Sequence, residues 1–126
     1  MSMKENIFQT LFSRNNKTIG VFELKLTKTG RLPFDRLASH QEQALLRAES
    51  TEGVAHKISD MSADKKPFDC FRIANTPGYV VILFYTPRKI KTAYYIRIHD
   101  YIALRTRSRR KSMTETEAAV FAEKTI

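Results

Sequence analysis

Apolar side chains in the first half of the chain recur with periods that distinguish helices from strands. In residues 6–12 (NIFQTLF) they stand at helical spacing, which predicts a short N-terminal helix. Residues 18–27 alternate between apolar and polar positions, which predicts a strand. A helix is predicted from Ser39 to about Ala48, because SHQE has the Ser-x-x-Glu form of a capping box. An extended connector, RLPF, should join the strand to this helix.

The second half is richer in predicted strands, which are expected over residues 54–59, 68–74, 79–85 and 92–98. Residues 79–85 are apolar on both faces, as is typical of a central strand. A short helix should begin near Asp100, and Thr114 with Glu117 predicts a capped C-terminal helix. The expected fold is α/β: one domain over residues 1–126 with a mixed central β-sheet flanked by helices, in which residues 105–126 form a basic segment and the C-terminal helix.

Length and composition agree with a single globular domain. The chain has 126 residues, of which 42% are hydrophobic and 28% charged. Its longest apolar run, Tyr79–Tyr85, is too short to cross a bilayer as a helix. The N-terminus has no apolar core of a secretory signal, and one cysteine, Cys70, excludes an internal disulfide framework. These features predict a cytoplasmic protein without a membrane partner.

Positive charge is the first indication of a partner. Lysine and arginine number 22 against 13 acidic residues, a net charge of +9, and the excess is concentrated in the second half. Such a surplus favours a polyanionic partner, either nucleic acid or an anionic membrane surface. The alternative is that the basic residues only keep the protein soluble.

Glu23 and Lys25 are candidates for chemistry because side chains two apart on a strand share a face. A carboxylate can hold a divalent cation at a phosphodiester, while an ammonium group orients or deprotonates the attacking water. Mg²⁺ prefers several oxygen ligands, so a second acid should come from another strand or helix. Taken alone, Glu-x-Lys is most often a surface ion pair.

Asp69 is the predicted second acid. It lies in FDCF, between apolar residues on an expected strand, where burial of an unpaired charge is unfavourable. Glu5 is a further candidate ligand, although a surface glutamate is the simpler interpretation. Cys70 should face the other side of that strand as a small core residue.

The segments FELKLTKTGRLPFDRLASHQEQALL, KISDMSADKKPFDCF and YVVILFY resemble the PD-(D/E)XK nuclease superfamily, and more closely its RecU-like Holliday-junction resolvases of phages and bacteria. The matching positions are Glu23, Lys25, Pro33, Phe34, His40 and Gln41. This resemblance spans about residues 20–99. It implies a restriction-endonuclease-like fold, Mg²⁺ (or Mn²⁺ as a substitute), a homodimer, and cleavage of branched DNA such as four-way junctions.

One departure from the family pattern concerns the second acid. The family places its metal-binding aspartate on the strand before Glu-x-Lys, but residues 1–22 contain no aspartate. Either the strand of Asp69 lies beside that of Glu23 in a rearranged strand order, or the second acid is missing. The first is favoured, because a single carboxylate is a poor magnesium site.

The predicted site therefore has Glu23 and Asp69 as metal ligands and Lys25 acting on the water. The resemblance gives Gln41 a role in placing the water or a phosphate, with a helix cap or surface amide as the alternative. Phosphate contacts that do not read the base sequence are predicted for Arg31, His40, Arg88, Lys89, Lys91, Arg105, Arg107, Arg109 and Arg110. The run from residue 105 could equally be a solvated face or a flexible tail.

The favoured interpretation is a magnesium-dependent, structure-specific DNA endonuclease of the Holliday-junction resolvase kind. Two alternatives stay open at this point. One is a nicking or restriction-like nuclease on the same fold, and the other is a non-catalytic DNA-binding protein.

Overall fold

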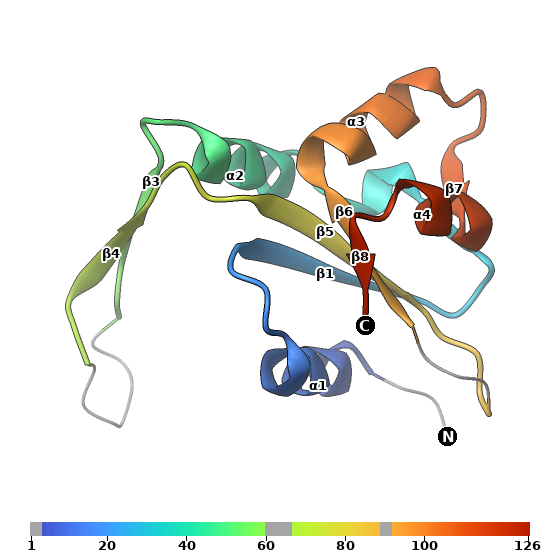
Figure 1. Ribbon diagram of the computed structural model, residues 1–126, viewed down its shortest axis with the longest axis horizontal. Coiled ribbons are helices and arrows are strands. Elements are labelled where there is room, and N and C mark those ends of the chain that lie inside the picture. Colours follow the sequence, from blue (N-terminus) through green and yellow to red (C-terminus); the bar gives the residue numbers. More distant parts are fainter. Residues whose placement is uncertain (1–3, 60–66, 89–91) are drawn as a thin grey trace.

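A computed structural model describes residues 4–59, 67–88 and 92–126 of the chain (Figure 1). Two predicted phosphate-binding residues, Lys89 and Lys91, lie outside the described residues. The elements in chain order are α1 (Glu5–Asn15), β1 (Val21–Thr27), β2 (Arg31–Pro33), η1 (Phe34–Arg36), α2 (Ser39–Glu49), β3 (Val54–Lys57), β4 (Cys70–Ile73), β5 (Gly78–Phe84), β6 (Ala93–Arg97), α3 (Ile98–Arg107), β7 (Ser112–Thr114), α4 (Glu115–Phe121) and β8 (Lys124–Thr125).

The main sheet has four strands in the order β1-β5-β6-β8. Strand β5 runs parallel to β1 and antiparallel to β6, and β6 runs antiparallel to β8, so the sheet is mixed. Every residue of β5 is buried, as its apolar sequence predicts for a central strand. The described residues therefore form one small α/β domain with a mixed central sheet, in which β1 is one of the two edge strands.

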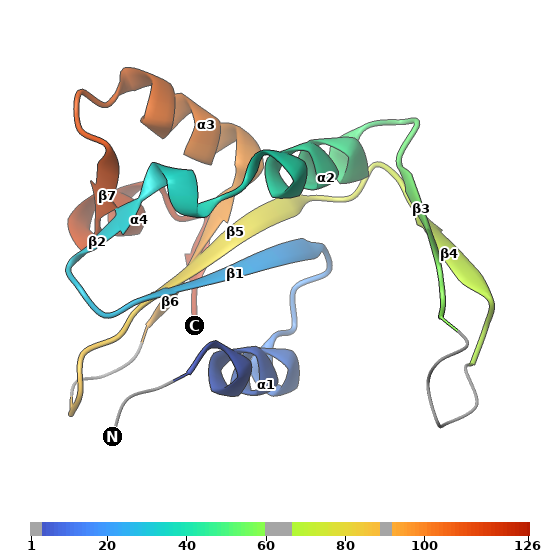
Figure 2. The same ribbon diagram turned by 180° about the vertical axis from the view of Figure 1, so that it is seen from behind.

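Helices cover both faces of the sheet (Figures 1 and 2). Helix α1 packs against one face, where Phe8 and Phe12 join Leu26 and Val81 in an aromatic-rich core. Helices α2, α3 and α4 cover the other face around a second core, which includes Tyr101. Two sheet faces, each buried by helices, explain why apolar positions are so dense along β5 and β6.

Alternation along β1 divides its side chains between these two cores. Leu26 joins the core under α1, whereas Glu23 and Lys25 stand opposite Val80 and Ile82 in the parallel ladder. The side chains of Val80 and Ile82 belong to the core under α2. The predicted sharing of one face by Glu23 and Lys25 is thus confirmed, and that face is the one covered by α2.

Strand β1 begins at Val21 rather than Thr18, because Asn16 organises the preceding turn. The Asn16 side chain accepts a hydrogen bond from the Thr18 backbone N–H and donates one to the Thr18 carbonyl, at 3.1 and 2.9 Å. This Asx-type turn takes Thr18 out of the extended ladder.

Helix α2 begins at Ser39 as predicted, but the predicted capping box is wrong, because the N-cap is Ala38 and not Ser39. The side-chain Oε1 of Gln41 accepts a hydrogen bond from the Ala38 backbone N–H at 2.9 Å. Glu42, the expected capping acid, instead forms an ion pair with Arg105 of α3. The predicted box of α4 is confirmed, since Thr114 and Glu117 exchange hydrogen bonds at its first turn.

Strands β3 and β4 form a separate antiparallel ribbon, here called the arm (residues 54–59 and 67–73), which projects away from the main sheet (Figure 2). The expectation that the strand following Asp69 lies beside the strand of Glu23 is wrong, because β4 pairs with β3 and β1 with β5. Asp69 directly precedes β4 and is exposed. A run such as FDCFRI has the same polarity pattern in a buried strand and in a one-sided ribbon, so its sequence could not decide between them.

The C-terminal third is folded rather than a tail. Arg105 and Arg107 belong to the last turn of α3, after which β7 pairs with β2 and β8 pairs with β6. Short strands of this kind leave little periodic signal, which is why the sequence pattern did not reveal them. Among the described ranges, no helix is long and apolar enough to span a bilayer.

Candidate functional site

Glu23, Lys25 and Gln41 form a connected polar cluster between β1 and the first turn of α2. The Gln41 Nε2 donates a hydrogen bond to Glu23 Oε1 at 2.8 Å, and the Lys25 ammonium donates one to Gln41 Oε1 at 3.1 Å. Lys25 Nζ also lies 3.5 Å from Glu23 Oε1. Three of the four residues predicted to be catalytic are therefore brought together by the fold. The fourth, Asp69, lies on the arm.

Burial distinguishes this cluster from an ordinary surface ion pair. The Lys25 side chain is 11% exposed and that of Glu23 is 31% exposed. A lysine is seldom buried to this extent unless it is paired, because desolvation of the ammonium must be offset. The surrounding structure therefore fixes a positive charge beside a carboxylate that still reaches solvent.

Gln41 has two functions that sequence reasoning treated as alternatives. Its Oε1 accepts both from the backbone N–H of Ala38 and from Lys25, while its Nε2 donates to Glu23. The amide thus caps α2 and holds both charged side chains of β1 in place. Helix start and site geometry depend on the same side chain.

The oxygen chemistry of the cluster fits a hard divalent cation. All polar contacts of Glu23 with other described residues are made by Oε1, which leaves Oε2 for a cation. Glu5 of α1 lines the same small cavity as Glu23, about 220 Å³ in volume, and its carboxylate lies 3.4 Å from Arg36. Mg²⁺ is commonly bound by one or two carboxylates, with waters and substrate oxygens completing the octahedron.

The described residues of one chain do not assemble a complete set of protein ligands. Among residues 4–59, 67–88 and 92–126, no three histidine, cysteine, aspartate or glutamate side chains come together as a metal-binding group. Asp69, the predicted second ligand, stands on the arm rather than on a strand beside β1. The desolvation argument that singled it out does not apply, since Asp69 is exposed.

The predicted phosphate-binding residues divide into two groups. Arg105 and Arg110 are held in ion pairs by Glu42 and Glu117, and the hydrogen bond to Glu42 raises the pKa of Arg105. The others in the described ranges are exposed: Arg31, His40, Arg88, Arg107 and Arg109. The Glu42–Arg105 pair joins α2 to α3 across 63 positions of sequence, and no local pattern could have revealed it.

Three basic residues line a surface depression of about 640 Å³. It is lined by Pro33, Phe34, Asp35, Leu37, Arg105, Arg110 and Lys111. Phe34 and Leu37 belong to the core under α2, so the depression opens on the same side of the sheet as Glu23 and Lys25. Positive charge and the polar cluster therefore share one side of the molecule.

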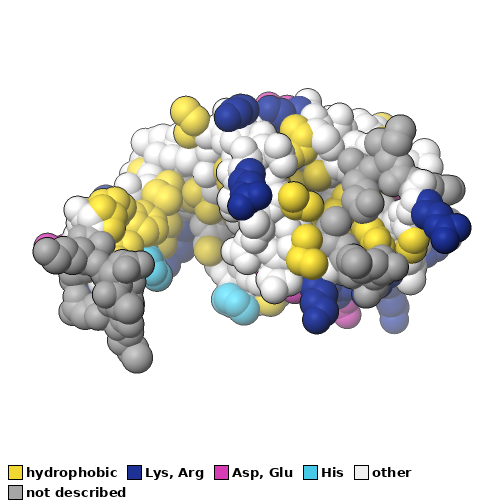
Figure 3. Space-filling view, turned by 90° about the horizontal axis from the view of Figure 1, so that it is seen from below, with side chains coloured by type: hydrophobic (Ala, Val, Ile, Leu, Met, Phe, Trp, Pro, Cys, Tyr) yellow, Lys and Arg dark blue, Asp and Glu magenta, His cyan; other side chains and the backbone are white. Residues whose placement is uncertain are grey.

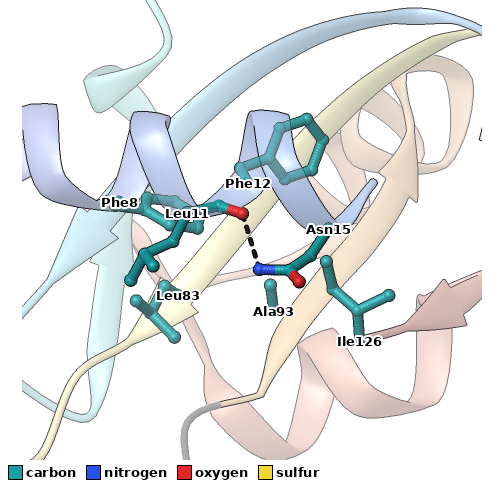
Figure 4. Close-up of a pocket in the computed structure, with 7 residues that line it drawn as sticks. All are labelled: Phe8, Leu11, Phe12, Asn15, Leu83, Ala93 and Ile126. Atoms are coloured by element: carbon teal, nitrogen blue, oxygen red, sulfur yellow. Dashed lines mark hydrogen bonds between the residues drawn. The ribbon is translucent and has the colours of Figure 1, made fainter. Parts of the chain in front are cut away.

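A second cavity, about 220 Å³, lies under α1 and offers no comparable chemistry (Figure 4). It is lined by Phe8, Leu11, Phe12, Asn15, Leu83, Ala93 and Ile126. None of these side chains is titratable, and the Asn15 amide turns back to donate to the Leu11 carbonyl at 2.8 Å. This apolar cavity therefore adds no candidate chemical group to those around Glu23.

Comparisons with protein-family models, curated proteins and solved structures give no match for this chain. The function must therefore be inferred from the geometry of the Glu23–Lys25–Gln41 cluster and from the charge around it.

Proposed function

We propose that this protein is a magnesium-dependent, structure-specific DNA endonuclease that hydrolyses phosphodiester bonds in branched DNA, as a Holliday-junction resolvase does. The observation that carries the proposal is the buried Lys25 ammonium, held by Gln41 next to the partly exposed Glu23 carboxylate. Its supporting context is a net charge of +9 and a basic depression on the same side of the sheet.

Each residue of the cluster has a distinct role in this mechanism. A Mg²⁺ ion bound at the site would polarise the scissile phosphate and lower the pKa of the attacking water. Glu23 supplies a carboxylate oxygen to that ion. Lys25 orients the water and offsets the negative charge that develops on the phosphate, and its effect is strengthened by burial in a medium less polarisable than water. Gln41 holds both side chains in position, because it forms a hydrogen bond with each of them.

DNA would be held mainly through its phosphates. Exposed arginines of α3 and the following turn, with the basic depression beside them, neutralise phosphates without reading bases. Recognition of backbone geometry suits an enzyme that selects a junction by its shape. Resolution of a four-way junction requires two matched nicks, and a homodimer with two sites supplies them.

The decisive experiment compares cleavage of labelled four-way junctions and linear duplex, with Mg²⁺ and with chelator. Glu23→Gln and Lys25→Met keep side-chain volume but remove the charge, and each should reduce cleavage at least about 100-fold while DNA binding persists. The matched controls Glu52→Gln and Lys28→Met change exposed residues and should cleave normally. Full activity in both site variants would exclude the mechanism.

DNA binding is tested separately through its dependence on salt. Arg107→Ala combined with Arg109→Ala should weaken binding and reduce the slope of log K against log[salt] by about 2, since each phosphate contact contributes roughly 0.9. Arg14→Ala with Lys17→Ala removes the same charge from α1 and the turn after it. Equal effects of the two pairs would show that overall charge, and not the α3 side, governs binding.

The runner-up function is DNA binding without catalysis. It is favoured by the incomplete ligand set of the described residues in a single chain. It predicts junction binding with no magnesium-dependent cleavage of any DNA, so the cleavage assay on the wild-type protein separates the two functions. A nicking or restriction-like nuclease would instead cut linear duplex as readily as junctions.

A further inference from the structure

The arm carries Asp69 on a ribbon that extends from the end of α2. The ladder of β3 and β4 continues outward, because the Ile58 N–H donates to the Asp69 carbonyl at 2.7 Å. Asp69 therefore lies about four residues, or roughly 13 Å, beyond Ile73 at the base of the arm. The arm projects from the body in both views (Figures 1 and 2).

The base of the arm is braced and does not act as a loose hinge. Backbone N–H groups of Asn75 and Thr76 donate to the carbonyls of Ser50 and Ala48, each at 2.9 Å. Gly53 has a φ of +74°, and a Cβ there would lie 2.2 Å from the Ile73 carbonyl oxygen. Folding the arm back onto its own β1 would break these contacts, so delivery of Asp69 to Glu23 of the same chain is disfavoured.

One face of the arm is apolar and is only partly covered by the described residues, since Val54 and Ile73 are half-buried and Phe71 is exposed. Val54 pairs with Ile73 and His56 with Phe71, so these four side chains share a face. The Phe71 ring is tilted against that of His56, with the ring centroids 5.4 Å apart, and Phe71 is still 36% exposed. Figure 3 shows hydrophobic side chains gathered on the arm. An isolated two-stranded ribbon is marginal in water, so its apolar face requires a partner surface.

Asp69 directly precedes β4, and if the alternation of β4 continues by one residue, as the bond from the Ile58 N–H to the Asp69 carbonyl supports, Asp69 lies on the face of Phe71 and Ile73. Lys57 and Arg72 occupy the opposite face, together with Ala55 and Cys70. DNA would approach the basic face, because phosphates are attracted to Lys57 and Arg72 and repelled by Asp69. An apolar face that bears a carboxylate is suited to contact a protein surface whose metal site has too few acidic ligands.

The site on β1 is such a surface. It presents the Glu23 carboxylate beside the buried Lys25 cation on the edge strand, and the described residues of one chain leave it short of ligands. We infer that the arm of a second copy of this chain covers this edge and supplies its Asp69 to the Glu23 site, so that each metal site is built from two chains. The inference rests on the proposed function and deepens it.

Reciprocal exchange of two arms makes a closed two-fold dimer with two identical sites. A single chain would then be inactive, and both nicks would be made by one assembly. Catalytic competence is in this way coupled to dimerisation, which prevents a monomer from making unmatched nicks in DNA.

Mixed dimers test this arrangement through activity. Glu23→Ala and Asp69→Ala chains, each inactive alone, are given different tags, unfolded and refolded together, and purified through both tags. One site of every mixed pair then has both acids intact, so nicking should return to about half of the wild-type rate. Sites built within single chains would stay inactive in the mixture, and this outcome overturns the inference.

A crosslink supplies a readout that does not depend on cleavage. In a Cys70→Ser background, Glu23→Cys chains are mixed with larger, tagged Asp69→Cys chains and treated with a short bis-maleimide. A product of the summed mass is expected without DNA, whereas Glu52→Cys in place of Asp69→Cys should give none. A crosslink within one doubly substituted chain, or a mixed product that forms only when DNA is added, would overturn the inference. If the wild-type protein cleaves no DNA but the crosslink still forms, the proposed function is refuted and the two-chain arrangement is not.

Discussion

Replacement of Gln41 by alanine tests the site geometry without any assumption about function. The substitution removes three contacts at once: the backbone N–H of Ala38 loses its acceptor, Glu23 loses a donor, and Lys25 loses an acceptor. The helix itself is otherwise unchanged, since alanine is the best helix former. Any loss of stability therefore reports on the polar cluster and the cap.

The expected loss follows from these contacts. Removal of a side-chain acceptor at a helix start lowers stability by about 1 kcal/mol. The hydrogen bond to the Glu23 carboxylate adds about 1 kcal/mol, less than the roughly 1.5–3 kcal/mol typical of a bond to a charged group, because the exposed part of Glu23 regains water. The free energy of unfolding should fall by about 2 kcal/mol, which lowers Tm by about 8 °C in a domain of this size.

Urea unfolding followed by far-ultraviolet circular dichroism measures this difference. Gln43→Ala is the matched control, because Gln43 is an exposed glutamine on the same helix and should change stability by less than about 0.5 kcal/mol. If the two variants are equally stable, Gln41 does not make the contacts described and the reasoning fails.

Gln41→Glu refines the test, because it keeps an acceptor for Lys25 but places a second carboxylate against Glu23. Two carboxylates at this separation share a proton, so one pKa is raised in the folded state. A raised pKa gives stability that is present at low pH and lost as pH rises. The free energy of unfolding of this variant should therefore approach that of wild type as the pH falls from 8 to 5. A difference that does not change with pH would place the two side chains apart.

Two further predictions concern stability away from the site. Burial raises the pKa of Tyr101 to about 12, so the stabilisation it gives should be complete well below pH 10, and about 2 kcal/mol of it should be lost by pH 12. In urea unfolding at alkaline pH, Tyr101→Phe should show a shallower decline than wild type, and parallel curves would contradict the assignment. Gly53→Ala should destabilise by more than about 1 kcal/mol because of its positive φ and the nearby Ile73 carbonyl, whereas Gly30→Ala, which meets open space, should change stability little in the same assay.

Sequence reasoning succeeded where the signal was local and periodic. Alternation along β1 correctly placed Glu23 and Lys25 on one face, and helical spacing located α1 and α2 to within a few residues. The position of Gln41 in the first turn after the connector was sufficient to bring it near that face. The proposed roles of these residues in cleavage remain predictions.

The errors arose where a pattern has two structural solutions. An apolar run around Asp69 suits a buried strand beside β1 as well as a projecting ribbon, and the chain forms the ribbon. Glu42 suits a capping box as well as an ion pair, and Arg105 is its partner. Strand pairing decided the first outcome, and the distant Arg105 decided the second.

The amino-acid sequence by itself determined the longer helices and strands and the face that Glu23 and Lys25 share, because backbone periods of 2 and 3.6 residues act over a few neighbouring positions. Only the tertiary structure decided which strands are neighbours, and with them the burial of Lys25, the double role of Gln41 and the separation of Asp69 from Glu23. Strand pairing depends on the summed burial and hydrogen bonding of the whole sheet, so no local segment contains that information.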